Sequence, residues 1–428
     1  MITPETLTDA ARTDGDTITV AALRHLRGQA LQPAPVPPVS GATVTSRPPL
    51  LIARPTLADQ QIRAAARTWL ASRAGHHRAN DPAEEALLHA VETSALARPP
   101  IADTASTVDA DLADIYLTLA RHWLELTKNS ADPRYLNAAL KLLSISLVAP
   151  VPATEQGAAA LAAALEALDT TTVPPAPPGS STRQHAYTAP AIPAPTGAVE
   201  PRIAVLAGAD SRGLPQFLAA AHSLPITGVV LHDGGQRQEP PGSAYGAAWY
   251  PAPRATHPRL ALAASPLPHH RVAHRDWSAA AAHLADWGTD LLVLIGMDVI
   301  PPTVLAVPRL GTINAHNGAL PTYRGMDAVA WAVLTGSPVV CSVHHVTEHV
   351  DAGHVLATSD VPSDAPDLRQ AVKDTQLRLL ADVCRHVATT GALPAGQPQA
   401  GPTRRYYRMH PALRRLLDVT TSPIGAAS

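Results

Sequence analysis

The chain has 428 residues, more than one typical domain holds, so its length alone predicts roughly two or three domains. Its formal net charge is −2, which provides no overall positive field and disfavours nucleic acid as a partner. The two cysteines, Cys341 and Cys384, lie far apart, and this argues against a disulfide framework. No apolar stretch is long enough to cross a bilayer, and the N-terminus lacks a signal-peptide pattern. We therefore expect a cytoplasmic protein with no membrane partner.

Proline-rich stretches divide the first half of the chain. Residues 32–55 and 173–201 carry many of the 43 prolines, and such a composition interrupts helices and central strands. Between them, apolar residues recur at helical spacing over 58–74, 83–97, 111–128, 134–148 and 153–168. The sequence thus predicts a helical and proline-rich extension, an α-helical bundle and a proline-rich linker, at 1–55, 56–170 and 171–201 respectively.

From Arg202 the pattern changes to strands that alternate with helices. Apolar strands are expected at 202–207, 227–232 and 290–295, with helices at 214–222 and 278–287. This alternation predicts an α/β domain with a doubly wound, Rossmann-like, mostly parallel sheet. We place the domain at 202–391, followed by a tail at 392–428. Ligands of such sheets bind beyond the carboxyl ends of the strands, so the chemistry is expected in the loops there.

Two polar motifs follow strands of this domain. The segment 311–325, GTINAHNGALPTYRG, carries Asn314 and His316 two residues apart at a strand end. Alternate residues of an extended chain point to the same side, so both side chains can face one pocket. Asp351 lies in a loop closed by Ala352 and Gly353, after a strand expected at 339–346.

These motifs, Asn-x-His, Leu-Pro-x-Tyr-Arg-Gly and Val-Asp-x-Gly in that order, resemble those of the folate-dependent formyltransferases. That family includes glycinamide ribonucleotide, methionyl-tRNA, sugar and natural-product N-formyltransferases, and the resemblance covers roughly residues 202–391. It implies transfer of a formyl group from 10-formyltetrahydrofolate to an amine without a metal ion, with Asn314, His316 and Asp351 as the catalytic trio. It also implies that the folate lies against two segments, formed by Leu294, Ile295, Gly296, Met297, Asp298, Val299 and Ile300, and by Val346, Thr347, Glu348, His349 and Val350.

The chemistry of the trio agrees with this assignment. An amine that attacks a formyl carbon directly builds negative charge on the carbonyl oxygen, which the Asn314 amide and a charged His316 would stabilise. Asp351 would keep His316 charged and oriented, since a nearby carboxylate raises the pKa of an imidazole. Asp351 could also relay the amine proton. We expect neither a covalent enzyme intermediate nor a metal.

Contacts to the acceptor amine are expected around the same loops. Ser211 and Arg212 precede a helix N-terminus, which suits an anionic group. The remaining candidates follow the Asn-x-His motif or lie on the neighbouring strand, and they are Asn317, Gly318, Tyr323, Arg324 and His344. A metal cluster of the neighbouring histidines is disfavoured, because adjacent residues of a strand point in opposite directions.

The residues after the Asn-x-His motif also bear on which kind of amine accepts the formyl group. Asn317-Gly318 stands where the primary-metabolic enzymes of the resembled family carry Pro-Ser, and it resembles the formyltransferases of natural-product biosynthesis. We therefore favour a small-molecule or peptide amine as the acceptor. Three alternatives stay open: a 10-formyltetrahydrofolate hydrolase, a methionyl-tRNA-type formyltransferase and a catalytically silent folate-fold binding protein. The helical bundle is hypothesised to bind a larger or carrier-bound substrate, and the sequence leaves dimerisation open.

Overall fold

The computed structural model of the protein describes residues 82–97, 110–130, 132–146, 184–186, 200–211, 213–234, 265–362, 365, 367–400 and 405–410, with isolated positions between 62 and 69, between 160 and 171, at 262 and between 413 and 417. The predicted extension at 1–55 and the candidate Arg212 lie outside the described residues. The chain divides into two compact units, Met1–Val173 with Gln238–Ala248 and Tyr407–Thr420, and Pro174–Arg237 with Trp249–Tyr406 and Thr421–Ser428. No described helix has the length and apolar character needed to cross a membrane.

The described residues of the first unit lie mainly in helices. Its main elements are α4 (Pro82–Ala97), α5 (Ala110–Asn129) and α6 (Pro133–Ser146). Pro133 occupies the first position of α6, where its missing N–H costs nothing, and Asp132 accepts a hydrogen bond from the backbone N–H of Arg134 at 3.1 Å. Tyr116, Leu119 and Trp123 are fully buried, so one face of α5 lies in the core of this unit.

Residues 407–410 belong to the helical unit. Tyr407, Arg408, Met409 and His410 are buried. The side chain of Asn137 accepts from the backbone N–H of His410 at 2.6 Å and donates to the carbonyl of Arg408 at 3.3 Å. The tail expected at 392–428 is therefore divided between the two units.

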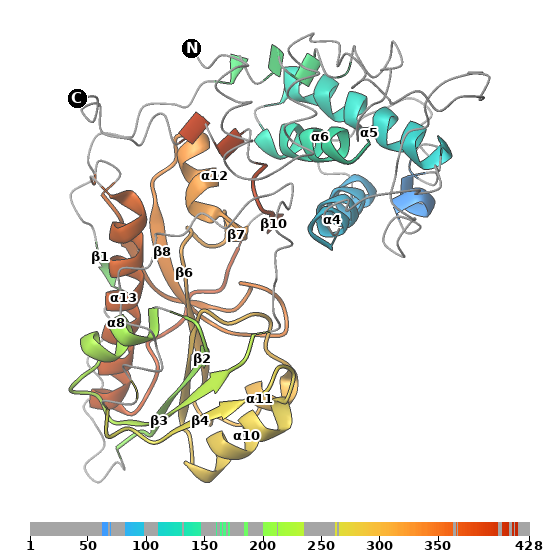
Figure 1. Ribbon diagram of the computed structural model, residues 1–428. Coiled ribbons are helices and arrows are strands. Elements are labelled where there is room, and N and C mark those ends of the chain that lie inside the picture. The colour runs from blue at the N-terminus through green and yellow to red at the C-terminus, as the bar shows by residue number, and fades with distance from the viewer. Residues whose placement is uncertain are drawn as a thin grey trace, which may run out of the picture. The chain divides into compact units, whose positions relative to one another are not determined.

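The second unit contains an eight-stranded sheet in the order β1-β9-β8-β6-β5-β2-β3-β4 (Figure 1). Its strands are β1 (Gln184–Ala186), β2 (Ile203–Gly208), β3 (Ile226–His232), β4 (His269–Val272), β5 (Leu291–Ile295), β6 (Gly311–His316), β8 (Val340–His345) and β9 (Val355–Asp360). Strands β4, β3, β2, β5 and β6 pair in parallel, whereas β8, β9 and β1 add antiparallel strands at one side. The predicted mostly parallel, doubly wound sheet is confirmed.

Helices cover both faces of this sheet (Figure 1). One face carries α8 (Gly213–Ala220) and α13 (Leu368–Thr390), and the other carries α10 (Trp277–Asp286) and α11 (Pro302–Leu305). Aspartate residues cap the N-termini of α10 and α13. Asp276 accepts from the backbone N–H of Ala279 at 3.1 Å, and Asp367 accepts from that of Gln370 at 3.0 Å. α12 (Ala328–Leu334) and the short parallel pair of β7 (Arg324–Gly325) and β10 (Arg405–Tyr406) lie beside the carboxyl end of β6.

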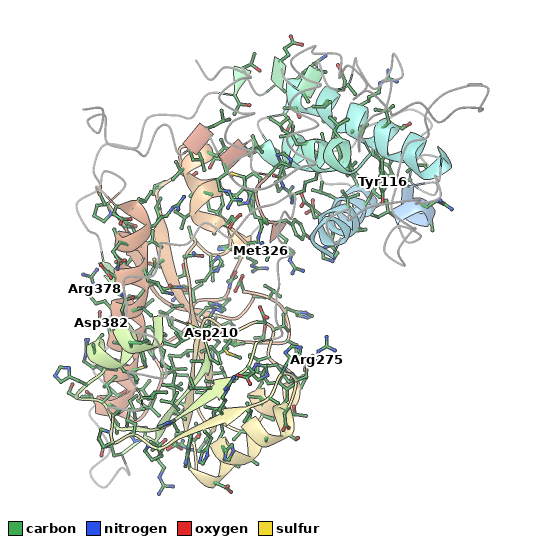
Figure 2. The ribbon with its side chains drawn as sticks, viewed as in Figure 1. Tyr116, Asp210, Arg275, Met326, Arg378 and Asp382 are labelled. Atoms are coloured by element: carbon green, nitrogen blue, oxygen red, sulfur yellow. The ribbon has the colours of Figure 1, made fainter. Side chains whose placement is uncertain are left out.

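The strand order reverses between β2 and β5, and ligands of open α/β sheets bind beyond the carboxyl ends of the strands at such a point. β2 ends at Gly208 and β5 is followed by Gly296. A Cβ on Gly208 would lie 2.8 Å from the carbonyl oxygen of Gly296, so only glycine permits this approach. Asp210, labelled in Figure 2, follows β2 at the same end of the sheet.

Candidate active site

Asp351 lies between two imidazole rings. Its Oδ2 is 3.6 Å from Nδ1 of His316, and its Oδ1 is 3.5 Å from Nε2 of His344. The backbone N–H of Gly325 donates to Oδ2 at 3.0 Å. The two histidines meet here because β6 and β8 pair antiparallel, with Asn314 opposite His344 in the register. The structure thus brings the three residues of the expected trio to neighbouring strand ends.

The Asp351 carboxyl is ionised. Burial alone would raise its pKa, but His316, His344 and the Gly325 N–H together hold the pKa well below its usual range. The side chain is only 12% exposed, so these partners act through a medium that screens them weakly. Asp351 itself adopts a left-handed backbone with φ 51°, which is uncommon for a residue other than glycine.

His316 is buried, and its burial acts against the charged imidazole that we expected from the sequence. Burial lowers the pKa of His316, and it outweighs the Asp351 carboxylate and the Tyr323 carbonyl, which raise it. Nε2 of His316 lies 2.6 Å from the carbonyl oxygen of Tyr323, which can only accept, so Nε2 carries the proton. Nδ1 is then free to take up a proton beside the Asp351 carboxylate. This arrangement suits removal of a proton better than donation of one.

The loop between β6 and α12 is held by packing and hydrogen bonds. A Cβ on Gly318 would lie 2.7 Å from Nε2 of His316, from the carbonyl oxygen of Tyr323 and from the Cβ of Ala328. The hydroxyl of Tyr323, a buried residue expected to contact substrate, donates to Ser337 at 2.7 Å. Gly318 and Tyr323 therefore shape the loop around His316, while Asn317 and Arg324 are half-buried.

The segments expected to hold the folate lie beyond the ends of β5 and β8. Leu294 and Ile295 are buried strand residues, so a ligand beside them would meet backbone groups. Beyond them Val299 is 65% exposed next to the exposed Asp298, and Met297 and Val346 are partly buried against the core. Thr347, Glu348 and His349 are exposed, at the end where a polar part of a ligand can be solvated.

The loop after β2 meets this segment. Gly296 adopts φ +61°, and a Cβ on it would lie 2.5 Å from Oγ of Ser211. A residue expected to contact the acceptor, Ser211, is therefore adjacent to one expected to contact the folate. This adjacency is what a transfer between two bound molecules requires.

Two polar residues of α13 hold the strand that carries Asn314 and His316, and no sequence motif had indicated them. The side-chain amide of Gln376 donates to the carbonyl of Ala315, the residue between Asn314 and His316. Lys373 donates to Oε1 of Gln376 at 3.0 Å. Their spacing places them on one face of a helix, but nothing in the sequence indicates which strand that face meets.

Comparison with known proteins gives a family for this part of the chain. A family model described as formyl transferase matches residues 249–383. The methionyl-tRNA formyltransferase of Deinococcus radiodurans is 30% identical over 126 residues, 28% of this chain and 40% of that protein. That of Bacteroides thetaiotaomicron is 34% identical over 92 residues, 21% of this chain and 29% of that protein. The solved structure of glycinamide ribonucleotide transformylase 1 from Symbiobacterium toebii is 23% identical and covers 49% of this chain and 94% of that one, with a TM-score of 0.35.

Residues 249–383 of the α/β unit thus match the formyl transferase family, in agreement with the resemblance that the motifs carry. The chain spans 40% or less of the length of these curated relatives. Asn314, His316 and Asp351 all lie within the matched segment, whereas Ser211 and the residues after 383 lie outside it.

Proposed function

We propose that this protein transfers a formyl group from 10-formyltetrahydrofolate to the amine of a small molecule or peptide in specialised metabolism. The observation that carries the proposal is the ionised Asp351, flanked by His316 and His344 beside Asn314 at the carboxyl ends of the strands. A carboxylate held among imidazoles in a largely buried site is an arrangement for moving a proton at a reacting amine.

Each group of the site has its own role in this transfer. The folate supplies the formyl group, and the C–N bond to the acceptor forms as the bond to the folate nitrogen breaks. Asn314 donates its side-chain N–H to the formyl oxygen as negative charge develops there. Nδ1 of His316 together with Asp351 receives the proton that the amine loses. That proton then becomes available to the leaving folate nitrogen, so the site returns to its starting state.

Backbone groups around Gly296 and the exposed apolar surface at Val299 would hold the folate ring. The acceptor would approach from the loop that carries Ser211 and from Asn317. No part of this scheme uses the hydroxyl of Tyr323, which is engaged with Ser337.

The net charge of −2 favours a small or peptidic amine over a polyanion. The second candidate is formylation of methionyl-tRNA, since the relatives named above are methionyl-tRNA formyltransferases. A local basic surface could serve that substrate without a positive net charge, so the two acceptors need a direct comparison.

The test is the turnover of 10-formyltetrahydrofolate by the purified full-length chain. It would be run without an acceptor, with amino sugars, amino acids, peptides and amines attached to a carrier protein, and with methionyl-tRNA. Amine-dependent release of tetrahydrofolate that His316→Ala and Asp351→Asn abolish would support the proposal and identify the acceptor class. Asp382→Asn, on the outer side of α13 (Figure 2), is the matched control. Formate release without any acceptor would instead indicate a hydrolase.

A further inference from the structure

Residues 396–400 and 405–406 lie beside the loops that carry the catalytic residues, and we call these residues the strap. Gln397 and Val355 exchange two backbone hydrogen bonds, of 2.8 and 2.9 Å. Further along, Arg405 and Tyr406 pair with Arg324 and Gly325. The strap therefore contacts the chain on both sides of Asp351.

Gln399 lies at the centre of the strap and uses both ends of its carboxamide. Its Nε2 donates to the carbonyl oxygens of Asp351 and Gly353, at 2.8 and 2.6 Å. Its Oε1 accepts from Nε of Arg324 at 2.9 Å, and also from Nη2. One half-buried side chain thus connects the turn that carries Asp351 to the loop that carries Arg324 and Gly325.

Hydrogen bonds hold Asp351 both at its backbone and at its side chain. Its backbone carbonyl is held by Gln399, and its carboxylate is held by the N–H of Gly325 at 3.0 Å. Tyr406 fixes the second loop, because its carbonyl oxygen accepts from the N–H of Met326, labelled in Figure 2, at 3.0 Å. Since Asp351 adopts a left-handed conformation that is unfavourable by itself, neighbouring contacts must impose it.

We propose that Gln399 is a positioning residue that holds the Asp351 carboxylate between His316 and His344 through its hydrogen bonds to the Asp351 turn. The inference rests on the proposed function only where turnover is the readout. Gln399 lies outside the segment that matches the formyl transferase family model, so the family match does not assign it this role. The charged and titratable groups around the carboxylate are His316, His344 and Arg324.

The experiment compares three substitutions in the full-length chain. Gln399→Met keeps the length of the side chain and removes all its hydrogen bonds. Gln399→Glu keeps the acceptor for Arg324 but replaces the donor to the Asp351 turn with a repelling oxygen. Gln397→Met is the matched control, because Gln397 is exposed and belongs to the strap through its backbone. Each variant is assayed for kcat per folate-binding site, for KM, and for hydrogen exchange of the Gly325 amide.

Both Gln399 variants are expected to lower kcat on the order of 10- to 100-fold, with KM for the folate unchanged. The Gly325 amide, which donates to Asp351, should exchange about 10-fold faster in both. The proposal is overturned if Gly325 exchange or kcat stays at the wild-type value in either Gln399 variant. It is also overturned if Gln397→Met produces the same losses. If the wild-type chain shows no turnover, the proposed function fails, and Gly325 exchange alone still decides whether Gln399 holds Asp351.

Discussion

Substitution of Gly318 by alanine should disable the site with little effect elsewhere. The new Cβ would lie 2.7 Å from three atoms: Nε2 of His316, the carbonyl oxygen of Tyr323 and the Cβ of Ala328. Each distance is about 0.8 Å short of the ~3.5 Å at which carbon contacts become favourable. The carbonyl belongs to the backbone and the Ala328 Cβ is fixed to a helix, so the His316 ring has the most freedom to yield.

A displaced His316 loses its hydrogen bond to Tyr323 and its alignment with Asp351. A shift near 1 Å at a reacting group costs on the order of 100-fold in rate, and overpacking costs about 1–3 kcal/mol of stability. The assay is kcat for folate turnover, with thermal unfolding as the measure of stability. Gly234→Ala is the control, because a Cβ there would have no atom within 4 Å. A wild-type kcat in Gly318→Ala would show that the loop accommodates the new Cβ without moving His316.

Three further outcomes are expected. Asp351→Asn should lower kcat roughly 100-fold or more while folate binding, followed by fluorescence, is retained, since the proton acceptor is lost and the shape is kept. His410 has its pKa lowered to about 3 by burial and by the neighbouring Lys141 and Arg414, so the unfolded state takes up the proton first and stability falls on acidification. Between about pH 7.5 and pH 5.5 the loss is about 1.4 kcal/mol for an unfolded pKa near 6.5, and urea unfolding of His410→Gln should lack this loss. Lys141→Met should destabilise the helical unit by about 3–5 kcal/mol in urea, because it leaves Glu92 buried without its ion-pair partner, and adding Glu92→Leu should recover much of that loss.

The sequence predicted those features that depend on local pattern. The alternation of apolar strands with helices indicated the doubly wound sheet, because each strand must be buried on both faces and each crossover needs a helix. The helix expected at 278–287 corresponds to α10, which Asp276 caps, whereas α13 was not predicted although Asp367 caps it in the same way. The order of the Asn314, His316 and Asp351 motifs was sufficient to indicate the family.

The tertiary structure decided what depends on distant segments. The contact of Gln399 with the Asp351 turn joins residues 48 positions apart and follows from no periodicity. The burial of residues 407–410 in the helical unit likewise depends on Asn137, more than two hundred residues earlier. The lowering of the His316 pKa by burial likewise depends on the tertiary structure, because its neighbours were visible in the sequence but its burial was not. Local propensity is encoded within a few residues. Desolvation of a side chain and hydrogen bonds between distant residues exist only once the chain has folded.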